Sequence, residues 1–147
     1  MVLTEDKSVF VDTNILVYCN NKDSSFCKPA RGKLDEFITR GNILFISEQV
    51  LREYLVIMTR PGILEKPISP ELAIDDIKRM QEQFNVLFPD DKALDILSDL
   101  IVRHGISGKR VHDTAIVSLM LANGISHILT NNVDDFKTFP EMTVHSL

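Results

Sequence analysis

The stretch SVFVDTNILVY (Ser8–Tyr18) decides how the fold begins. After Ser8, the residues of SVFV are β-branched or aromatic, which is typical of a short buried strand. Asp12 ends this strand, and the apolar residues of TNILVY begin a helix at once. The sequence therefore predicts a strand, a turn and a helix, with a carboxylate at the carboxyl end of the strand.

Outward from this stretch, short strand patterns alternate with longer helical ones. Further strands are expected at Ile43–Ser47, Val86–Phe88 and His127–Thr130, and within MTVHSL (142–147). Helices are expected at Lys28–Arg40, at 48–58 after a Ser47 cap, and at Pro70–Phe84, Asp90–His104 and His112–Asn123, with NNVDDF (131–136) as a loop. The alternation predicts an α/β fold, a three-layer α/β/α sandwich around a central, mostly parallel sheet of about four to five strands.

Two of these helices show the apolar spacing of a face that packs on a sheet. The expected inward residues are Leu72, Ala73, Ile77 and Met80 in the first helix, and Ala93, Leu94, Leu97, Leu100 and Ile101 in the second. Open parallel sheets bind ligands beyond the carboxyl ends of their strands, so acids at those ends are candidate site residues.

Length and composition predict a single domain over residues 1–147. Hydrophobic residues make up 44% and charged residues 25%, an ordinary balance for a globular protein. No apolar run approaches the roughly 20 residues needed to cross a bilayer. The start, MVLTEDKSVF, lacks the basic and then apolar pattern of a signal peptide. We therefore expect a cytoplasmic protein with no membrane attachment.

The net charge of −5 argues against a protein that coats nucleic acid through a broad basic field. It leaves open an enzyme that holds a short stretch of RNA through a bound cation. Cys19 and Cys27 have no further Cys or His at zinc-ligand spacing. Because disulfides are rare in the cytoplasm, we expect a buried thiol at these positions rather than a disulfide.

Four acidic positions are expected near one edge of the sheet. Asp12 ends the first strand, and Asp113 opens the helix at His112–Asn123. Asp135 follows the fourth strand, and Glu53 lies about two turns into the helix after the second strand, on a largely apolar face. In a parallel sheet these positions share one rim.

Each acid taken singly has a structural explanation. Asp12 could cap the helix that follows it, and Asp113 could complement a helix dipole. Asp134 and Asp135 could be turn residues, and Glu53 could belong to a salt bridge. Taken together, three or four carboxylates at one rim would repel one another and raise some pKa values. A divalent cation removes that repulsion, and oxygen ligands without His or Cys favour Mg²⁺ or Mn²⁺ over zinc.

Four segments resemble, in order and spacing, the signatures of PIN domains, above all those of VapC-type toxins. These segments are DTNILVY (Asp12–Tyr18), SEQVLREYLVIMTRP (Ser47–Pro61), VHDTAIVSLMLANG (Val111–Gly124) and ILTNNVDDF (Ile128–Phe136). The resemblance spans nearly the whole chain. The opening DTN and the HD pair before an apolar helix are the more specific parts of it.

The resemblance implies a set of site residues. Asp12, Glu53 and Asp113 fall on the three family acids, and Asp135 is our choice for the fourth. Some members carry the fourth acid where this chain has Asn132, which we expect to be a polar contact, and we place Asp134 outside the site. The same pattern implies that Asn14 and Thr130 support the acids by hydrogen bonds. Lys109 and Arg110, in the loop before the HD pair, are candidates to hold an RNA phosphate or are simply solvated.

The resemblance also implies an activity and partners. It predicts an endoribonuclease that hydrolyses RNA phosphodiester bonds with Mg²⁺ or Mn²⁺, restrained by a small VapB-like antitoxin in a toxin–antitoxin pair. Asp12 and Asp113 would bind the metal directly, and Glu53 and Asp135 through water or at a second ion. VapC-type proteins form homodimers, so a homodimer is expected.

Three other functions compete with this interpretation. A phosphatase of haloacid-dehalogenase type needs an Asp two positions after Asp12, where the chain has Asn14, and gives Glu53 no role. A receiver domain needs an Asp at the end of the third strand, where Pro89 fits badly. A catalytically silent PIN-like scaffold that binds RNA or protein stays open, although the intact acids favour an enzyme.

Overall fold

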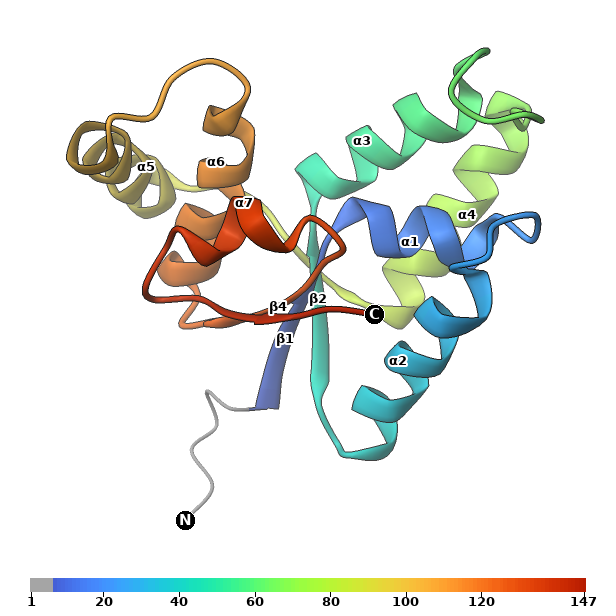
Figure 1. Cartoon of the computed structure of the whole chain (residues 1–147), viewed down its shortest axis with the longest axis horizontal. Helices are drawn as coiled ribbons and strands as arrows, with labels where there is room; N and C mark the ends of the chain where they lie inside the picture. The colour runs from blue at the N-terminus through green and yellow to red at the C-terminus, as the bar shows by residue number, and fades with distance from the viewer. Residues whose placement is uncertain (1–6) are drawn as a thin grey trace.

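The computed structural model describes residues 7–147 and has a central sheet with helices packed around it (Figure 1). The strands are β1 (Ser8–Val11), β2 (Ile43–Ser47), β3 (Asn85–Leu87), β4 (His127–Leu129) and β5 (Thr143–His145). The helices are α1 (Thr13–Asn20), α2 (Cys27–Thr39), α3 (Glu48–Thr59), α4 (Pro70–Gln83), α5 (Asp91–His104), α6 (Arg110–Ala122) and α7 (Val133–Lys137).

The sheet has the strand order β3-β2-β1-β4-β5, and every neighbouring pair is parallel. Phe10 lies beside Phe45 of β2 and Ile128 of β4, so β1 is the central strand. The predicted α/β fold with a parallel sheet is confirmed, and the sheet is parallel throughout.

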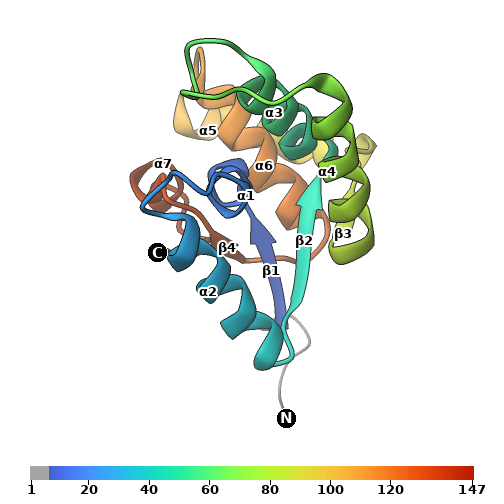
Figure 2. The ribbon, with the colours of Figure 1, turned by 90° about the vertical axis from the view of Figure 1, so that its right-hand side faces the viewer.

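The connections place the helices in two layers. From β1 to β3 the chain moves in one direction, so right-handed crossovers put α1, α2 and α4 on one face. After β3 the chain returns past β1 to β4, which puts α5 and α6 on the opposite face (Figures 1 and 2). The direction of winding changes between β1 and β4. Carboxyl ends of strands at such a point form the usual ligand crevice of an open sheet.

Local signals explain where the helices begin and end. The Ser47 hydroxyl accepts a hydrogen bond from the N–H of Val50 at 3.2 Å and so caps α3. Ser69 caps α4 in the same way, with Pro70 as the first helical residue. Gly105 ends α5 with φ 61°, a left-handed conformation that favours glycine.

Two elements differ from the sequence-based expectation by more than one residue. NNVDDF was expected to be a loop, but Val133–Lys137 form the short helix α7. Phe136 is fully buried and anchors this short helix in the core. A helix of five residues is too short to show a periodic apolar pattern in the sequence. The helix expected from His112 begins at Arg110, so the preceding loop is shorter than expected.

The expected inner faces of α4 and α5 are partly wrong. Leu72 and Leu94 are exposed, at 56% and 59%, whereas Ala73, Met80, Ala93 and Leu100 are buried. On α4 the buried face includes Asp76, because the Tyr54 hydroxyl satisfies its carboxylate from α3. Because a polar residue lies on the inner face of α4, the face that is buried differs from the one that apolar spacing alone predicts.

The core lies on both sides of the central strands. Phe10, Ile46, Tyr54, Ile116 and Phe136 are among its largest fully buried side chains. Both cysteines are free thiols; Cys27 is buried, as expected, and Cys19 is half-buried. None of the helices in residues 7–147 has the length and apolar character required to cross a bilayer.

Candidate active site

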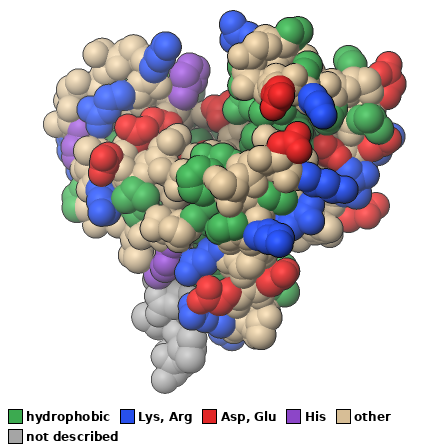
Figure 3. All heavy atoms as spheres, turned by 45° about the vertical axis from the view of Figure 1, so that its right-hand side comes forward, with side chains coloured by type: hydrophobic (Ala, Val, Ile, Leu, Met, Phe, Trp, Pro, Cys, Tyr) green, Lys and Arg blue, Asp and Glu red, His purple; other side chains and the backbone are tan. Residues whose placement is uncertain are grey.

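The four acids identified from the sequence lie around the carboxyl ends of β1 and β4. Asp12 comes from the β1–α1 junction, Glu53 from α3, Asp113 from α6 and Asp135 from α7. Figure 3 shows that this end of the molecule is hollowed between two lobes, with acidic and hydrophobic side chains in the hollow. We call this surface, with its four acids, the acidic groove.

Asp12 is buried and held by neutral donors. Its Oδ1 accepts a hydrogen bond from the N–H of Thr13 at 2.8 Å, so the side chain caps α1. Its Oδ2 accepts from the Thr130 hydroxyl at 2.8 Å and from the Asn14 side-chain amide at 3.3 Å. Helix capping therefore accounts for one oxygen of Asp12, while the other is bound by the two residues that were expected to support it.

The environment of Asp12 disfavours its charged form. Burial is the main cause and raises the pKa of its carboxyl from 3.8 to about 6. Hydrogen bonds from Thr130 and Thr13 lower the pKa, whereas the nearby charges of Glu53 and Asp113 raise it. A buried carboxylate without a cation is unfavourable, and a bound cation would relieve both the burial and the repulsion.

Glu53 is half-buried, and each of its oxygens accepts a hydrogen bond from a neutral donor. The Thr13 hydroxyl donates to Oε2 at 2.7 Å, and the Gln49 amide donates to Oε1 at 2.9 Å. The neighbouring Arg52 pairs with Glu48 at 2.7 Å instead. In the described part of the chain, Glu53 therefore forms none of the ion pairs that would explain it as a structural residue.

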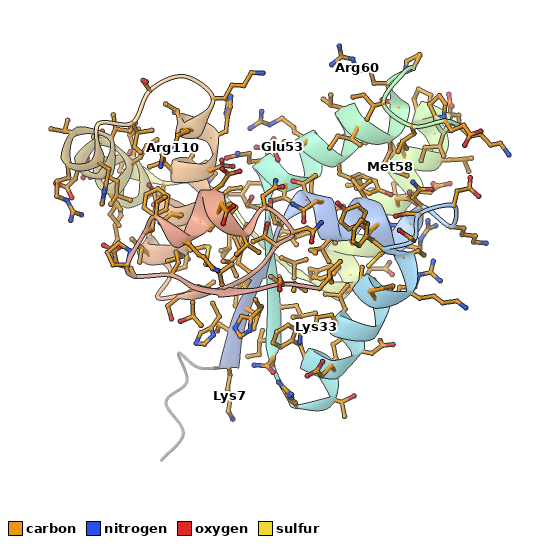
Figure 4. The ribbon with its side chains drawn as sticks, in the orientation of Figure 1. Lys7, Lys33, Glu53, Met58, Arg60 and Arg110 are labelled. Atoms are coloured by element: carbon orange, nitrogen blue, oxygen red, sulfur yellow. The ribbon has the colours of Figure 1, made fainter. Side chains whose placement is uncertain are left out.

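Gln49 connects the two helices that flank the groove. The same Nε2 that donates to Glu53 also donates to the backbone carbonyl of His112 on α6, at 3.1 Å. Figure 4 shows Glu53 in the part of α3 nearest to α6, and Arg110 on α6. A chain of hydrogen bonds thus runs from Glu53 through Gln49 to the residue that precedes Asp113.

Asp113 is half-buried in the first turn of α6. Burial is again the main cause that raises the pKa of its carboxyl, followed by the charges of Asp135 and Glu53. The charges of His112 and Arg110 act in the opposite direction. Asp12, Glu53, Asp113 and Asp135 are therefore close enough for their charges to interact, although they come from four separate elements.

The two asparagines after β4 donate backbone hydrogen bonds to residues that support Asp12. The N–H of Asn132 donates to the Thr130 hydroxyl at 3.0 Å, and the N–H of Asn131 donates to Asn14 Oδ1 at 3.0 Å. Asn132 itself is exposed, and its side chain makes no cap hydrogen bond to α7. Its contact with the site is thus made by its backbone.

The remaining candidates lie outside this network. Asp134 is exposed on α7. Lys109 and Arg110 are exposed at the start of α6, and the Arg110 guanidinium donates to the Thr138 hydroxyl at 3.3 Å. Arg110 also lowers the pKa of Asp113, which places its charge near the groove.

The donors of the groove suit a hard divalent cation. Carboxylate oxygens are preferred ligands of Mg²⁺ and Mn²⁺, and the buried Asp12 carboxyl forms no ion pair with a cationic side chain among residues 7–147. Among residues 7–147, no three Asp, Glu, His or Cys side chains are already arranged to hold an ion together. Mg²⁺ keeps several waters and usually binds through one or two carboxylates, so the residues fit it without such a cage.

Three residues of the network were not identified from the sequence: Thr13, Gln49 and Asn131, whose backbone N–H donates to Asn14. Thr13 donates its hydroxyl to Glu53 across forty positions, and nothing in its local sequence signals this contact. Gln49 lies four residues before Glu53, a spacing that puts both side chains on one face of a helix. That spacing could have singled out Gln49.

Comparisons with known proteins identify the family of the chain. The family model described as the PIN domain matches residues 9–141. A curated relative, Ribonuclease VapC48 of Mycobacterium tuberculosis, is 25% identical over 136 residues, covering 87% of this chain and 89% of that protein.

Solved structures show the same fold at lower identity. VapBC2 from Rickettsia felis, bound to a DNA fragment from its promoter, superposes with a TM-score of 0.70 at 21% identity, over 95% of this chain and 98% of the other. VapC20 of Mycobacterium tuberculosis, described as a toxin that cleaves the Sarcin-Ricin loop, gives 0.67 at 17% identity, over 91% and 98%. The family match covers most of the sequence, and this chain belongs to the PIN domain family.

Proposed function

We propose that the chain is a metal-dependent endoribonuclease that hydrolyses RNA phosphodiester bonds and acts as the toxin of a toxin–antitoxin pair. The observation that carries the proposal is the buried Asp12 carboxylate, which has no cationic partner among the described residues and is surrounded by other acids. The likeness to a curated ribonuclease over 87% of the chain supports the RNA substrate.

The proposed roles follow from the contacts of each acid. Asp12 and Asp113 would hold one Mg²⁺ or Mn²⁺, with Glu53 and Asp135 binding it through water or helping to hold a second ion. When bound, the cation supplies an activated water and neutralises charge that builds on the phosphate oxygens. Thr130, Asn14 and Thr13 hold the Asp12 carboxylate in one orientation.

Glu53 is the proposed proton acceptor. Each of its oxygens accepts one hydrogen bond and keeps one lone pair, which leaves room for the proton of the attacking water. Water oxygen then bonds to phosphorus, the bond from phosphorus to the leaving oxygen breaks, and that oxygen takes a proton from solvent. Asp135, exposed beside Asp113, is favoured over Asn132 as the fourth acid because its charge raises the pKa of Asp113.

A partner protein is part of the proposal. Several similar folds are described as complexes of VapB and VapC, including DNA-bound VapBC from Salmonella typhimurium. A VapB-like antitoxin that presents cationic side chains would find their complement in the acidic groove. A homodimer remains the expected arrangement of the chain itself. The alternative, a catalytically silent scaffold, would keep the fold and the partner but not the cleavage.

A cleavage assay tests the nuclease proposal. We expect the purified chain to cut a fluorogenic single-stranded RNA with Mg²⁺ or Mn²⁺, and to stop when EDTA is added. Asp113→Asn and Asp135→Asn should lose activity, whereas Asp134→Asn, which removes the same charge from the next exposed position, should keep it. Cleavage that persists in EDTA and in Asp113→Asn would exclude the proposed mechanism.

Expression in a bacterial host tests the toxin proposal separately. Wild-type chain should arrest growth unless its antitoxin is supplied, and Asp113→Asn should not. If growth is normal while the purified protein still cuts RNA, the nuclease proposal stands and the toxin proposal is wrong.

A further inference from the structure

Two aromatic rings pack against each other at a tilt near the end of α1, the helix that begins beside Asp12. The ring centroids of Tyr18 and Phe26 are 4.8 Å apart with an interplanar angle of 32°. Tyr18 is half-buried at the end of α1, whereas Phe26, just before α2, is 41% exposed. Tyr18 thus supports one side of a ring whose remaining surface meets solvent. Exposed aromatic faces of this kind are what unpaired nucleobases stack on.

Hydrogen bonds tie this ring pair to the candidate active site. The Tyr18 hydroxyl accepts from the Asn131 side-chain amide at 3.2 Å. The N–H of Asn131 donates to Asn14 Oδ1, and the Asn14 amide donates to Asp12 Oδ2. Six residues of helix separate Asp12 from Tyr18, which is a rise of about 9 Å. A nucleotide close to the scissile phosphate would therefore be within reach of the rings.

A positively charged hollow is lined by residues on both sides of Phe26 in the sequence, though not by the Phe26 ring itself. It has a volume of about 330 Å³ and is lined by Lys22, Ser24, Ser25, Cys27, Lys28 and Arg31. No carboxylate lines it, and within residues 7–147 its three cations form no ion pair. Residues 22–31 hold these three cations and one acid, Asp23, and Arg31 Nε donates to the Cys19 carbonyl at 2.8 Å; in a chain of net charge −5 this is still a local positive excess that favours an anion. On the face of the molecule drawn in Figure 3, Lys and Arg side chains (blue) gather on the right-hand side.

The hollow that Phe26 itself lines is chemically different. Asp23, Glu65 and Lys66 also line it, so a neutral base could lie on the ring there, but a phosphate would meet two carboxylates. Charge therefore selects the side with Lys22, Lys28 and Arg31 for the nucleic-acid backbone.

We propose that Phe26 and the hollow beside it form a subsite for single-stranded RNA, with a base stacked on Phe26 and a backbone phosphate held by Lys22, Lys28 and Arg31. The inference rests on the proposed ribonuclease function and adds the surface that binds substrate next to the acids. One aromatic face beside unpaired cations matches a nucleotide, which carries both a flat base and an anion. A protein helix would need a wider apolar surface than a hollow lined by Lys and Ser. Only an unpaired base can leave its stack to meet the ring, which selects single strands.

Fluorescence offers a direct test because the chain contains no tryptophan. Phe26→Trp, in an Asp12→Asn background that prevents cleavage, places one reporter at the proposed stack. A single-stranded oligoribonucleotide should quench this fluorescence in a saturable way. Val102→Trp, at a residue that is 82% exposed on α5, is the matched control and should show no saturable quenching. Equal responses of the two reporters, or none at Phe26→Trp, would overturn the proposal.

Salt dependence tests the cations. Each phosphate contact to a single strand contributes a slope of about 0.7 in log K against log salt concentration. Because the two lysines share one phosphate, Lys22→Gln with Lys28→Gln should weaken RNA binding and reduce the slope by about 0.7. Lys78→Gln with Lys92→Gln removes the same charge from exposed positions on α4 and α5 and should leave the slope unchanged. A slope that changes equally in both pairs would contradict a local phosphate contact.

Cleavage kinetics separate this proposal from the nuclease proposal. Phe26→Ala should raise KM for RNA by about 5- to 100-fold, the range for loss of one stacked base, and should leave the affinity for Mn²⁺ unchanged. If wild type cuts RNA but Phe26→Ala has the same KM, the subsite is wrong and the nuclease stands. If RNA quenches Phe26→Trp but wild type never cuts it, the nuclease proposal fails and the subsite stands. If an antitoxin quenches the reporter and RNA does not, the ring pair belongs to a protein interface.

Discussion

Two buried carboxylates lie near α3 and differ in what surrounds them. Asp76, on α4, is 9% exposed; its Oδ2 accepts a hydrogen bond from the Tyr54 hydroxyl at 2.6 Å, and its Oδ1 pairs with Arg79. Asp12 is 5% exposed and is bound by Thr13, Asn14 and Thr130, which are all neutral. The nearest charges that act on Asp12 belong to further acids.

The contrast distinguishes a structural carboxylate from a functional one. Asp76 has its own cation and its own buried hydroxyl, so its charge is satisfied within the chain. Asp12 accepts three hydrogen bonds from neutral donors and has no cationic side chain as a partner among the described residues. An uncompensated buried carboxylate opposes folding, and it is retained where a ligand supplies the missing charge.

The largest expected effect comes from replacing each carboxylate by its amide. Asp12→Asn keeps an oxygen acceptor but removes the charge that a cation needs, so RNA cleavage should fall by roughly 10³-fold, a loss of several kcal/mol of transition-state stabilisation. Asp76→Asn should leave kcat within about threefold, because Asp76 lies outside the acidic groove. Steady-state cleavage rates of both variants, with saturating Mn²⁺, measure the contrast.

The stabilities of the two variants should rank in the opposite order to their cleavage activities. Without metal, Asp76→Asn should be less stable than Asp12→Asn. Asp76→Asn breaks an ion pair with the largely exposed Arg79 and weakens a buried hydrogen bond, so the free energy of unfolding should fall by about 1–3 kcal/mol. Urea denaturation at pH 7.5 without metal checks this. An Asp76→Asn variant that loses cleavage while remaining folded would remove the distinction between the two carboxylates.

The second prediction concerns pH. The pKa of Asp12 is about 6 in the folded chain and 3.8 when unperturbed, so the folded state holds the proton more tightly. Its stabilising contribution is fully present below pH 3.8 and is lost as the pH rises through 6. Ionisation of Asp12 should cost about 3 kcal/mol over this range. The difference in unfolding free energy between Asp12→Asn and wild type, measured without metal, should therefore grow in favour of the variant from pH 4 to pH 7.

Metal should reverse this trend. Mn²⁺ binds the ionised carboxylates, so it should raise the Tm of wild type more at pH 7.5 than at pH 5.5, and should raise that of Asp12→Asn little at either pH. Asp134→Asn is the charge-matched control and should behave as wild type. Equal stabilisation of wild type and Asp12→Asn by Mn²⁺ would show that the ion binds elsewhere.

Most of the fold could be predicted from sequence because its signals are local. Ser47 and Gly105 mark helix ends by capping and by backbone freedom, and the run SVFV before Asp12 marks a buried strand. Leu72 and Leu94 were placed wrongly because the apolar spacing is compatible with more than one buried face, and on α4 a polar pair shares that face. The pairing of Tyr54 with Asp76 is such a case, since it joins two helices across 22 residues.

The site was predictable only in part for the same reason. Asp12 and Asp113 stand at recognisable junctions, and their positions at one rim follow from the parallel topology. Thr13 and the Asn131 backbone contribute contacts that no spacing reveals. The partner of Thr13 lies 40 positions away, and that of Asn131 lies 117 positions away. Their roles depend on packing between elements that are distant in sequence.

The smallest expected effect comes from removing the neutral donor Gln49 that contacts Glu53. This change tests whether such a donor positions a functional acid. Gln49→Leu keeps the size of the side chain but removes both hydrogen bonds, to Glu53 and to the His112 carbonyl. We expect cleavage to fall by about 10- to 100-fold, the range for residues that orient a metal site without binding the ion. Gln81→Leu, on the exposed surface of α4, is the matched control.

The split between kcat and KM decides what Gln49 does. If Gln49 orients Glu53, kcat should fall while KM for RNA and the unfolding free energy stay near wild type, because the acids that bind the ion are unchanged. Loss of stability with kcat unchanged would make Gln49 a structural link between α3 and α6, comparable to Tyr54 beside Asp76. In that case the hydrogen bond from Gln49 to Glu53 would be structural, like the one from Tyr54 to Asp76. Asp12 alone would then differ from Asp76 in what its environment indicates about function.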